Sequence, residues 1–114
     1  MTERAEPLVL INLFAMPPDL IDGFIQKWPG NIEKAKGAKG FRGTRLHRAI
    51  DPDAQYPVVN LARWDSAEDW RATVSEHFWL PGSPAPEGRF PVAHPALYTV
   101  AHDTPDPLAA AGNR

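Results

Sequence analysis

The sequence contains no cysteine, which excludes disulfides, thiolate metal sites, iron–sulfur clusters and a cysteine nucleophile. It also lacks an excess of positive charge, because 12 Lys and Arg residues face 14 Asp and Glu residues. Nucleic acids and anionic membranes bind proteins through such an excess, so we expect neither as a partner. The apolar run Leu8–Ala15 is too short to span a bilayer, and Met1–Pro7 shows no targeting signal. These absences favour a cytoplasmic protein.

What is present indicates a globular chain. Of the 114 residues, 43% are hydrophobic, and the aromatic residues comprise 4 Trp, 2 Tyr and 5 Phe. This length suits one compact domain with limited capacity to bury its own surface. We expect that domain over residues 1–102, followed by a mobile polar tail over residues 103–114.

Apolar periodicity and turn residues predict six elements. Strands are expected over Leu8–Ala15, Phe41–Ile50, Tyr56–Trp64 and Ala96–His102, and helices from Asp19 and from Ser66 to about Phe78. Asp19 and Ser66 are the expected N-caps, and Pro29-Gly30 is expected to kink or break the first helix after Trp28.

The order strand, helix, strand, strand, helix, strand predicts an α+β fold of the ferredoxin-like, split βαβ type. Its antiparallel four-stranded sheet would carry both helices on one face. The other face would be bare and apolar, so we expect two copies to pack face to face as a homodimer, a dimeric α/β barrel. The proline-rich segment Leu80–His94 is expected to be irregular and is a candidate lid over a site.

Two asparagines interrupt apolar strands. Asn12 lies within LVLINLFA and Asn60 within VVNLARW, where strand alternation places Asn60 on the same face as Trp64. A buried amide needs hydrogen-bond partners, which periodicity does not supply. Either asparagine alone could satisfy backbone groups at a bulge or edge, and Trp64 could be a core residue. Two asparagines in adjacent strands favour a functional site.

The segments KGFRGTRLHRA, VVNLARWDSAEDW and HPALYTV, with the first strand and its proline turn, resemble the antibiotic biosynthesis monooxygenase (ABM) family. Within it the chain is most similar to the quinone-forming monooxygenases of aromatic polyketide pathways. That resemblance implies oxidation of a polycyclic phenol or anthrone by O2 without metal, flavin or haem. It matches Asn60 and Trp64 to the family's Asn and Trp four residues apart, and Asn12 to its first-strand Asn.

The residue chemistry agrees with this implication. Triplet O2 reacts poorly with closed-shell molecules, but an electron-rich phenolate can donate one electron to it. Amide and indole N–H groups in a dry pocket would stabilise that anion, each contributing about 3 kcal/mol. We therefore assign catalytic roles to Asn60, Trp64 and Asn12 as a hypothesis.

Three further residues are candidate substrate contacts, each with a plainer interpretation. Trp70 aligns with a substrate-contacting aromatic of the family but could pack on the sheet. His77 could be a base or a ligand, or could cap its helix. Arg89 could pair with a phenolate from the candidate lid or be solvated. His47, His94 and His102 lack the spacing of a metal site, so no metal is expected, and the resemblance implies that no cofactor is needed.

Three alternatives remain open. A haem-degrading relative would combine Asn12, Trp70 and His77 around haem. A polyketide cyclase would use the same pocket for an aldol closure without oxygen. A non-catalytic dimer would bind a small aromatic metabolite through the same donors.

Overall fold

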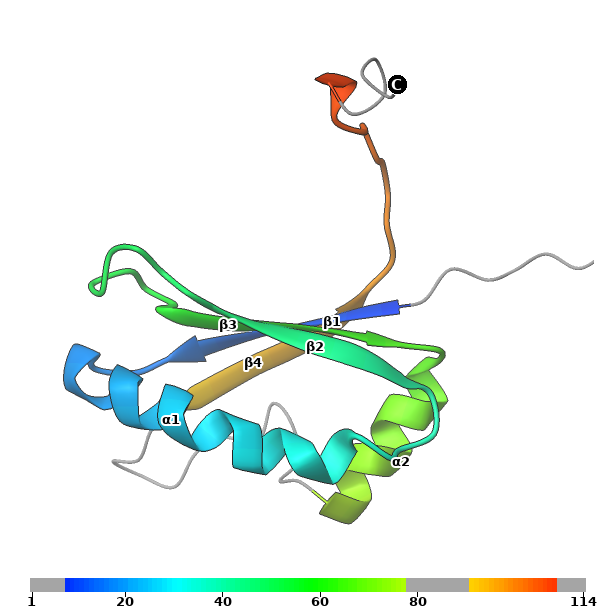
Figure 1. The fold of residues 1–114 in the computed structure, drawn as a ribbon, viewed down its shortest axis with the longest axis horizontal. Coiled ribbons are helices and arrows are strands. Elements are labelled where there is room, and N and C mark those ends of the chain that lie inside the picture. Colours follow the sequence, from blue (N-terminus) through cyan, green and yellow to red (C-terminus); the bar gives the residue numbers. More distant parts are fainter. Residues whose placement is uncertain (1–7, 78–90, 109–114) are drawn as a thin grey trace, which may run out of the picture.

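The computed structural model describes residues 8–77 and 91–108. Its elements are β1 (Leu8–Ala15), α1 (Ile21–Ile32), β2 (Phe41–Arg48), β3 (Val58–Trp64), α2 (Ala67–His77) and β4 (Val92–Tyr98), with 3₁₀ turns over Pro18–Leu20 and Glu33–Ala35. The strands form one antiparallel sheet in the order β2-β3-β1-β4. Both helices cover the same face of that sheet (Figure 1). The predicted ferredoxin-like α+β fold is confirmed.

The core lies between the sheet and the two helices because one face of each central strand is apolar. In β3 the residues Val58, Asn60, Ala62 and Trp64 are buried, and the intervening positions are not. Helix α1 packs its Phe24, Ile25 and Trp28 against a cluster around Phe14. Helix α2 packs Trp70 against a second cluster formed by Leu10, Ala62 and Trp64. The two clusters divide the interior into an α1 end and an α2 end.

Helix α1 departs from the sequence prediction at both of its marked positions. It begins after the 3₁₀ turn over Pro18–Leu20, so Asp19 lies within that turn, and no side chain caps the helix at Leu20. It also continues through Pro29 to Ile32, so the predicted break after Trp28 is wrong. Proline removes one backbone hydrogen bond, whereas packing of the apolar face supplies most of a helix's stability. Trp28 and Phe24 form that packing, with ring centroids 6.0 and 4.9 Å from Phe14.

Helix α2 and the β2–β3 hairpin follow the prediction closely. The Oγ of Ser66 accepts a hydrogen bond from the backbone N–H of Asp69 at 3.1 Å, which is the expected N-cap. The hairpin loop closes at Asp51, whose carbonyl accepts the N–H of Ala54 at 3.0 Å. Strong local signals therefore fixed these two elements.

Strand β4 begins and ends four residues earlier than predicted, at Val92 and Tyr98. Residues 92–94 thus form a strand where the proline-rich segment was expected to be irregular. Pro95 sits within this strand and pairs with Asn12 of β1. Because β4 is an edge strand, a residue without an N–H group is tolerated there. The rest of the candidate lid, residues 78–90, lies outside the described residues.

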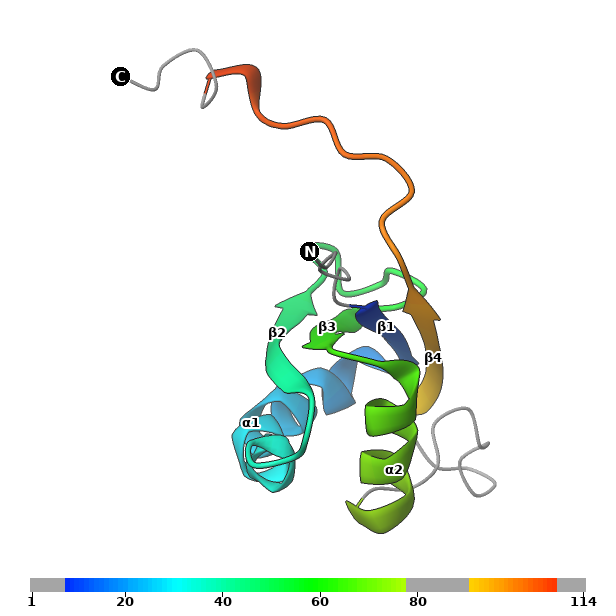
Figure 2. The ribbon, with the colours of Figure 1, turned by 90° about the vertical axis from the view of Figure 1, so that its right-hand side faces the viewer.

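The face opposite the helices is not covered by either of them (Figure 2). Half-buried apolar residues form its centre, among them Val9, Ile11, Leu13 and Leu61. Residues 99–108 leave the sheet on this side and are exposed throughout. No helix within residues 8–77 and 91–108 is long and apolar enough to cross a membrane.

Candidate active site

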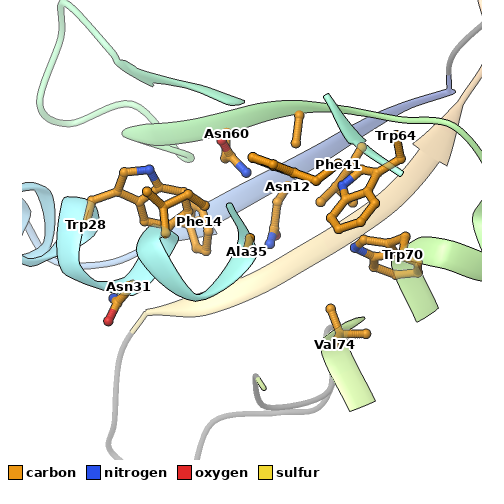
Figure 3. A pocket seen from close by; sticks show the side chains of 13 residues that line it. Asn12, Phe14, Trp28, Asn31, Ala35, Phe41, Asn60, Trp64, Trp70 and Val74 are labelled. Carbon is orange, nitrogen blue, oxygen red and sulfur yellow. The ribbon is translucent and has the colours of Figure 1, made fainter. Parts of the chain in front are cut away.

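An open cavity of about 680 Å³, including the solvent at its mouth, lies between the sheet and the two helices. Three strands, both helices and the 3₁₀ turn over Glu33–Ala35 supply the residues that line it (Figure 3): Leu10, Asn12, Phe14, Trp28, Asn31, Ile32, Ala35, Phe41, Asn60, Ala62, Trp64, Trp70 and Val74. The wall is therefore mostly apolar and aromatic, with three asparagines and three indoles as its polar groups.

Asn12 and Asn60 are brought together by the pairing of β1 with β3, in which they stand directly opposite one another. Both side chains lie on the helix-covered face and line the cavity. Asn60 is 5% exposed, and its Oδ1 accepts a hydrogen bond from the hydroxyl of Thr44. The Oδ1 of Asn12 is buried without a hydrogen-bond partner. The two amides therefore differ: the side-chain carbonyl of Asn60 is hydrogen-bonded to Thr44, and that of Asn12 is unpaired.

Trp64 combines a packing role with an unused donor. The residue is 3% exposed, and its ring packs edge-on to Phe41 with centroids 5.3 Å apart. Its indole Nε1 is nevertheless buried without a partner. An unpaired buried N–H costs about 1–3 kcal/mol, and such groups are rare in native proteins. Trp64 is thus a core residue that also keeps a free donor in the cavity wall.

Of the three candidate substrate contacts, only Trp70 can be placed in the cavity. It lies on α2 and lines the cavity near Trp64 and Val74 (Figure 3). His77 is the last residue of α2, and its side chain lies outside what the structure describes. Arg89 lies outside the described residues altogether.

Sequence reasoning missed four residues at the cavity. Trp28, Asn31 and Phe41 line the cavity, and the hydroxyl of Thr44 donates a hydrogen bond to Oδ1 of Asn60. Trp28 belongs to the apolar face of α1, where a tryptophan supplies an N–H group as well as surface. Strand alternation does not predict the position of Thr44, because the sheet face on which its side chain lies depends on an irregularity in β2. The sequence signal for that irregularity is Gly43 inside an otherwise alternating strand.

No ionisable side chain belongs to the described residues that line the cavity. Charge lies instead at the outer surface, where Arg42 donates two hydrogen bonds to Asp65 at 2.8 and 2.9 Å. These bonds lower the pKa of Asp65 and raise that of Arg42. Within residues 8–77 and 91–108 no cluster of three or more His, Asp and Glu residues could hold a metal ion. The described chemistry of the cavity is therefore hydrogen bonding in an uncharged surrounding.

Fold and cavity define a small α+β protein with a hydrogen-bonding site between its sheet and its helices. The sequence model of the antibiotic biosynthesis monooxygenase (ABM) family matches residues 7–78, and the chain belongs to that family. Its membership identifies it as a monooxygenase. No match was found among curated proteins.

Solved structures support the same assignment. A protein of Shewanella loihica PV-4, provisionally assigned as a monooxygenase, is 28% identical with a TM-score of 0.72. That alignment covers 89% of this chain and 100% of the other. A variant of SnoaB, a cofactor-independent oxygenase from Streptomyces nogalater, is 16% identical with a TM-score of 0.62, covering 90% and 100%. The haem-degrading protein of Mycobacterium tuberculosis is 20% identical with a TM-score of 0.62, also covering 90% and 100%. The SnoaB variant and the haem-degrading protein therefore share the fold of this chain.

Proposed function

We propose that this monooxygenase is cofactor-independent and oxidises a polycyclic phenol or anthrone to a quinone with O2. The observation that carries the proposal is the unpaired indole N–H of Trp64 in the wall of an uncharged cavity. A substrate oxyanion would accept a hydrogen bond from it and remove the cost of leaving it unpaired. The amide N–H groups of Asn60 and Asn12 line the same cavity and supply further donors.

The proposed reaction needs no further reactant. The anthrone loses a proton to water and becomes an enolate, whose negative oxygen the three donors stabilise; the peroxide formed later takes a proton back from water before it loses water itself. One electron passes to O2, and the resulting superoxide recombines with the ring carbon to form a peroxide. Loss of water then leaves the quinone, so that one anthrone and one O2 give one quinone and one water. The apolar wall excludes bulk water and strengthens each donor's interaction with the anion.

The flat substrate class follows from the aromatic wall. Trp28 and Phe14 stand at the α1 end of the cavity, and Phe41, Trp64 and Trp70 stand at the α2 end (Figure 3). Aromatic side chains favour offset or edge contacts with a fused ring system. In this proposal the rings of the substrate lie between these two ends while its oxygens meet the asparagines.

Haem is the main alternative ligand, and the described cavity offers little for its iron. Axial ligation requires His, Cys, Met or Tyr. None of these types occurs among the described residues that line the cavity. Titration of the protein with hemin tests the alternative: a sharp Soret band at one equivalent would support haem binding, and its absence would support our proposal.

The direct test is oxygen uptake with dithranol as a model anthrone, in air and without additives. We expect one O2 consumed per quinone formed, with one atom of ¹⁸O2 entering the quinone. The asparagine variant Asn60→Ala and the indole variant Trp64→Phe should each lose about 100-fold in turnover. A cyclase would consume no O2 in this assay. Tight binding with no product would indicate a binding protein.

We also propose that the bare sheet face pairs with a second copy of the chain. Support comes from the apolar centre of that face and from residues 99–108, which extend from the same side. Burying such surface gains about 25 cal/mol per Å². Light scattering should give a homodimer at micromolar concentration, and Leu61→Asp should give a monomer. A monomeric parent protein would contradict this proposal.

A further inference from the structure

Strand β2 contains one extra residue beside the cavity. Phe41 pairs with Trp64 of β3, and the next pair is Thr44 with Ala62, so three steps along β2 match two along β3. Gly43 lies within this bulge at a φ of 109°, a conformation that favours glycine. In a regular strand, residues three positions apart point to opposite faces. The bulge instead places Phe41 and Thr44 on the same, helix-covered face.

This shift brings the hydroxyl of Thr44 next to the side-chain oxygen of Asn60. The hydroxyl donates a hydrogen bond to Asn60 Oδ1, and both side chains are at least partly buried. With its oxygen engaged, the amide of Asn60 directs its nitrogen toward the cavity, as Figure 3 shows. A terminal amide can otherwise turn by 180° at modest cost, which would exchange donor for acceptor.

We propose that Thr44 is a positioning residue that fixes the Asn60 amide with its N–H groups, rather than its oxygen, facing the substrate. The catalytic consequence rests on the proposed function, in which Asn60 stabilises a substrate oxyanion. A turned amide would present a lone pair to that anion and repel it. Without Thr44 the productive orientation loses its advantage, and turnover falls although Asn60 is still present.

Two surface interactions support the bulge that carries Thr44. The Nη2 of Arg63 donates to the carbonyl of Arg42 at 2.9 Å, which satisfies a backbone group at the irregularity. Arg42 in turn holds Asp65, just beyond the end of β3, through two hydrogen bonds. The chain therefore anchors this bulge from the outside while Thr44 acts on the inside.

The kinetic test compares Thr44→Val, which removes the hydroxyl at nearly constant shape, with Thr44→Ser, which keeps it. We expect Thr44→Val to lower kcat for dithranol about tenfold with KM changed less than about twofold, and Thr44→Ser to restore most of the loss. In an Asn60→Ala background, Thr44→Val should change kcat by less than about twofold. Additive losses, or failure of serine to rescue, would overturn the proposal.

Thr73→Val is the matched control. Thr73 is a buried threonine, whereas Thr44 is half-buried; the hydroxyl of Thr73 donates to the backbone carbonyl of Asp69 at 3.0 Å, and Thr73 does not line the cavity. We expect this variant to keep the parental kcat. A tenfold loss here as well would show that removing any buried hydroxyl disturbs the enzyme, and would overturn the specific role of Thr44.

A ligand-free measurement separates the proposal from the proposed function. The side-chain NH2 signals of Asn60, assigned by their loss in Asn60→Ala, should show NOEs to cavity-lining residues and none to the Thr44 methyl group. In Thr44→Val these signals should shift or broaden while those of Asn12 stay in place. NOEs from the Asn60 NH2 to Thr44 in the parent protein would overturn the proposal even if dithranol is oxidised. If the expected NOEs are observed but dithranol is not oxidised, the proposed function is rejected and the role of Thr44 in orienting the amide is not.

Discussion

Replacing Asn12 by leucine should stabilise the fold while removing most of the activity. The Oδ1 of Asn12 is buried without a partner, and an unpaired buried acceptor costs about 1–3 kcal/mol. Leucine has a similar volume and would extend the apolar row that Leu10 and Phe14 form on the same face. We expect a gain of about 1–2 kcal/mol in the free energy of unfolding, or roughly 4–10 °C in Tm.

The activity should change in the opposite direction. If the amide of Asn12 donates to the substrate oxyanion, its removal costs about 100-fold to 1000-fold in kcat, which is the usual effect of losing one such donor. Denaturant unfolding followed by circular dichroism gives the stability. Oxygen uptake with dithranol gives the activity of the same preparation.

Asn60→Leu is the matched control because Asn60 stands directly opposite Asn12. Its carbonyl is occupied by Thr44, so leucine would leave that hydroxyl without its acceptor. We expect this variant to lose about 1–3 kcal/mol of stability along with its activity. Our reasoning is refuted if Asn12→Leu is destabilised as much as Asn60→Leu, because Asn12 would then be held by structural hydrogen bonds. It is refuted equally if Asn12→Leu remains fully active.

Three further changes test other parts of the structure. Trp64→Phe should alter the free energy of unfolding by less than about 2 kcal/mol, because removing the unpaired N–H offsets the lost packing. Oxygen uptake by this variant should fall about 100-fold, and full activity would contradict the donor role of Trp64. Gly43→Ala should destabilise the protein by about 1–3 kcal/mol in thermal unfolding, because Gly43 has a positive φ. Gly23→Ala in α1 is the control and should be neutral or stabilising, because a Cβ at Gly23 meets nothing within 4 Å. Equal effects of the two substitutions would argue against a strained bulge. Asp65 has a pKa below its ordinary value, chiefly through its hydrogen bonds from Arg42, so its contribution to stability is present above about pH 4 and is lost as pH falls through the lowered pKa. Urea unfolding of Asp65→Asn should therefore differ from the parent at pH 6 and converge with it on acidification, and a difference that grows instead would reverse the assigned sign.

Elements with strong local signals were predictable from sequence. The capping serine and first-turn acids located α2, and the branched apolar residues of β1 located that strand to the residue. Elsewhere tertiary context overrode the local signal. Pro29 marked a helix break, but aromatic packing of Phe24 and Trp28 on Phe14 keeps α1 continuous. The last strand was expected to begin only at Ala96, after the proline-rich segment, but the sheet order makes β4 an edge strand where Pro95 is tolerated.

The candidate site was predictable where it depends on strand pairing alone. Alternation puts Asn60 and Trp64 on one face, and pairing of β1 with β3 adds Asn12 opposite Asn60. Thr44 and Phe41 could not be placed this way, because period-two counting assigns them to opposite faces. One bulge residue reverses that assignment. Asn31 depends on the rotation of α1 about its axis, which an amphipathic pattern defines only within about one turn.

The departures from local preference share a location. Asn12 and Asn60 are polar residues in apolar strands, Pro95 is a proline in a strand opposite Asn12, and Gly43 is a bulge glycine three residues before Leu46, which pairs with Asn60. Each departs from what a regular strand prefers, and natural sequences keep such conflicts mainly where function requires them. Asn12, Asn60 and Pro95 lie in one row across the sheet, and the bulge lies nearby in the edge strand β2, so the sheet is least regular beside the proposed donors. Among these residues Asn12 is the one whose replacement by an apolar side chain should stabilise the sheet, because its carbonyl oxygen is buried without a partner, and that replacement would remove one of the proposed oxyanion donors.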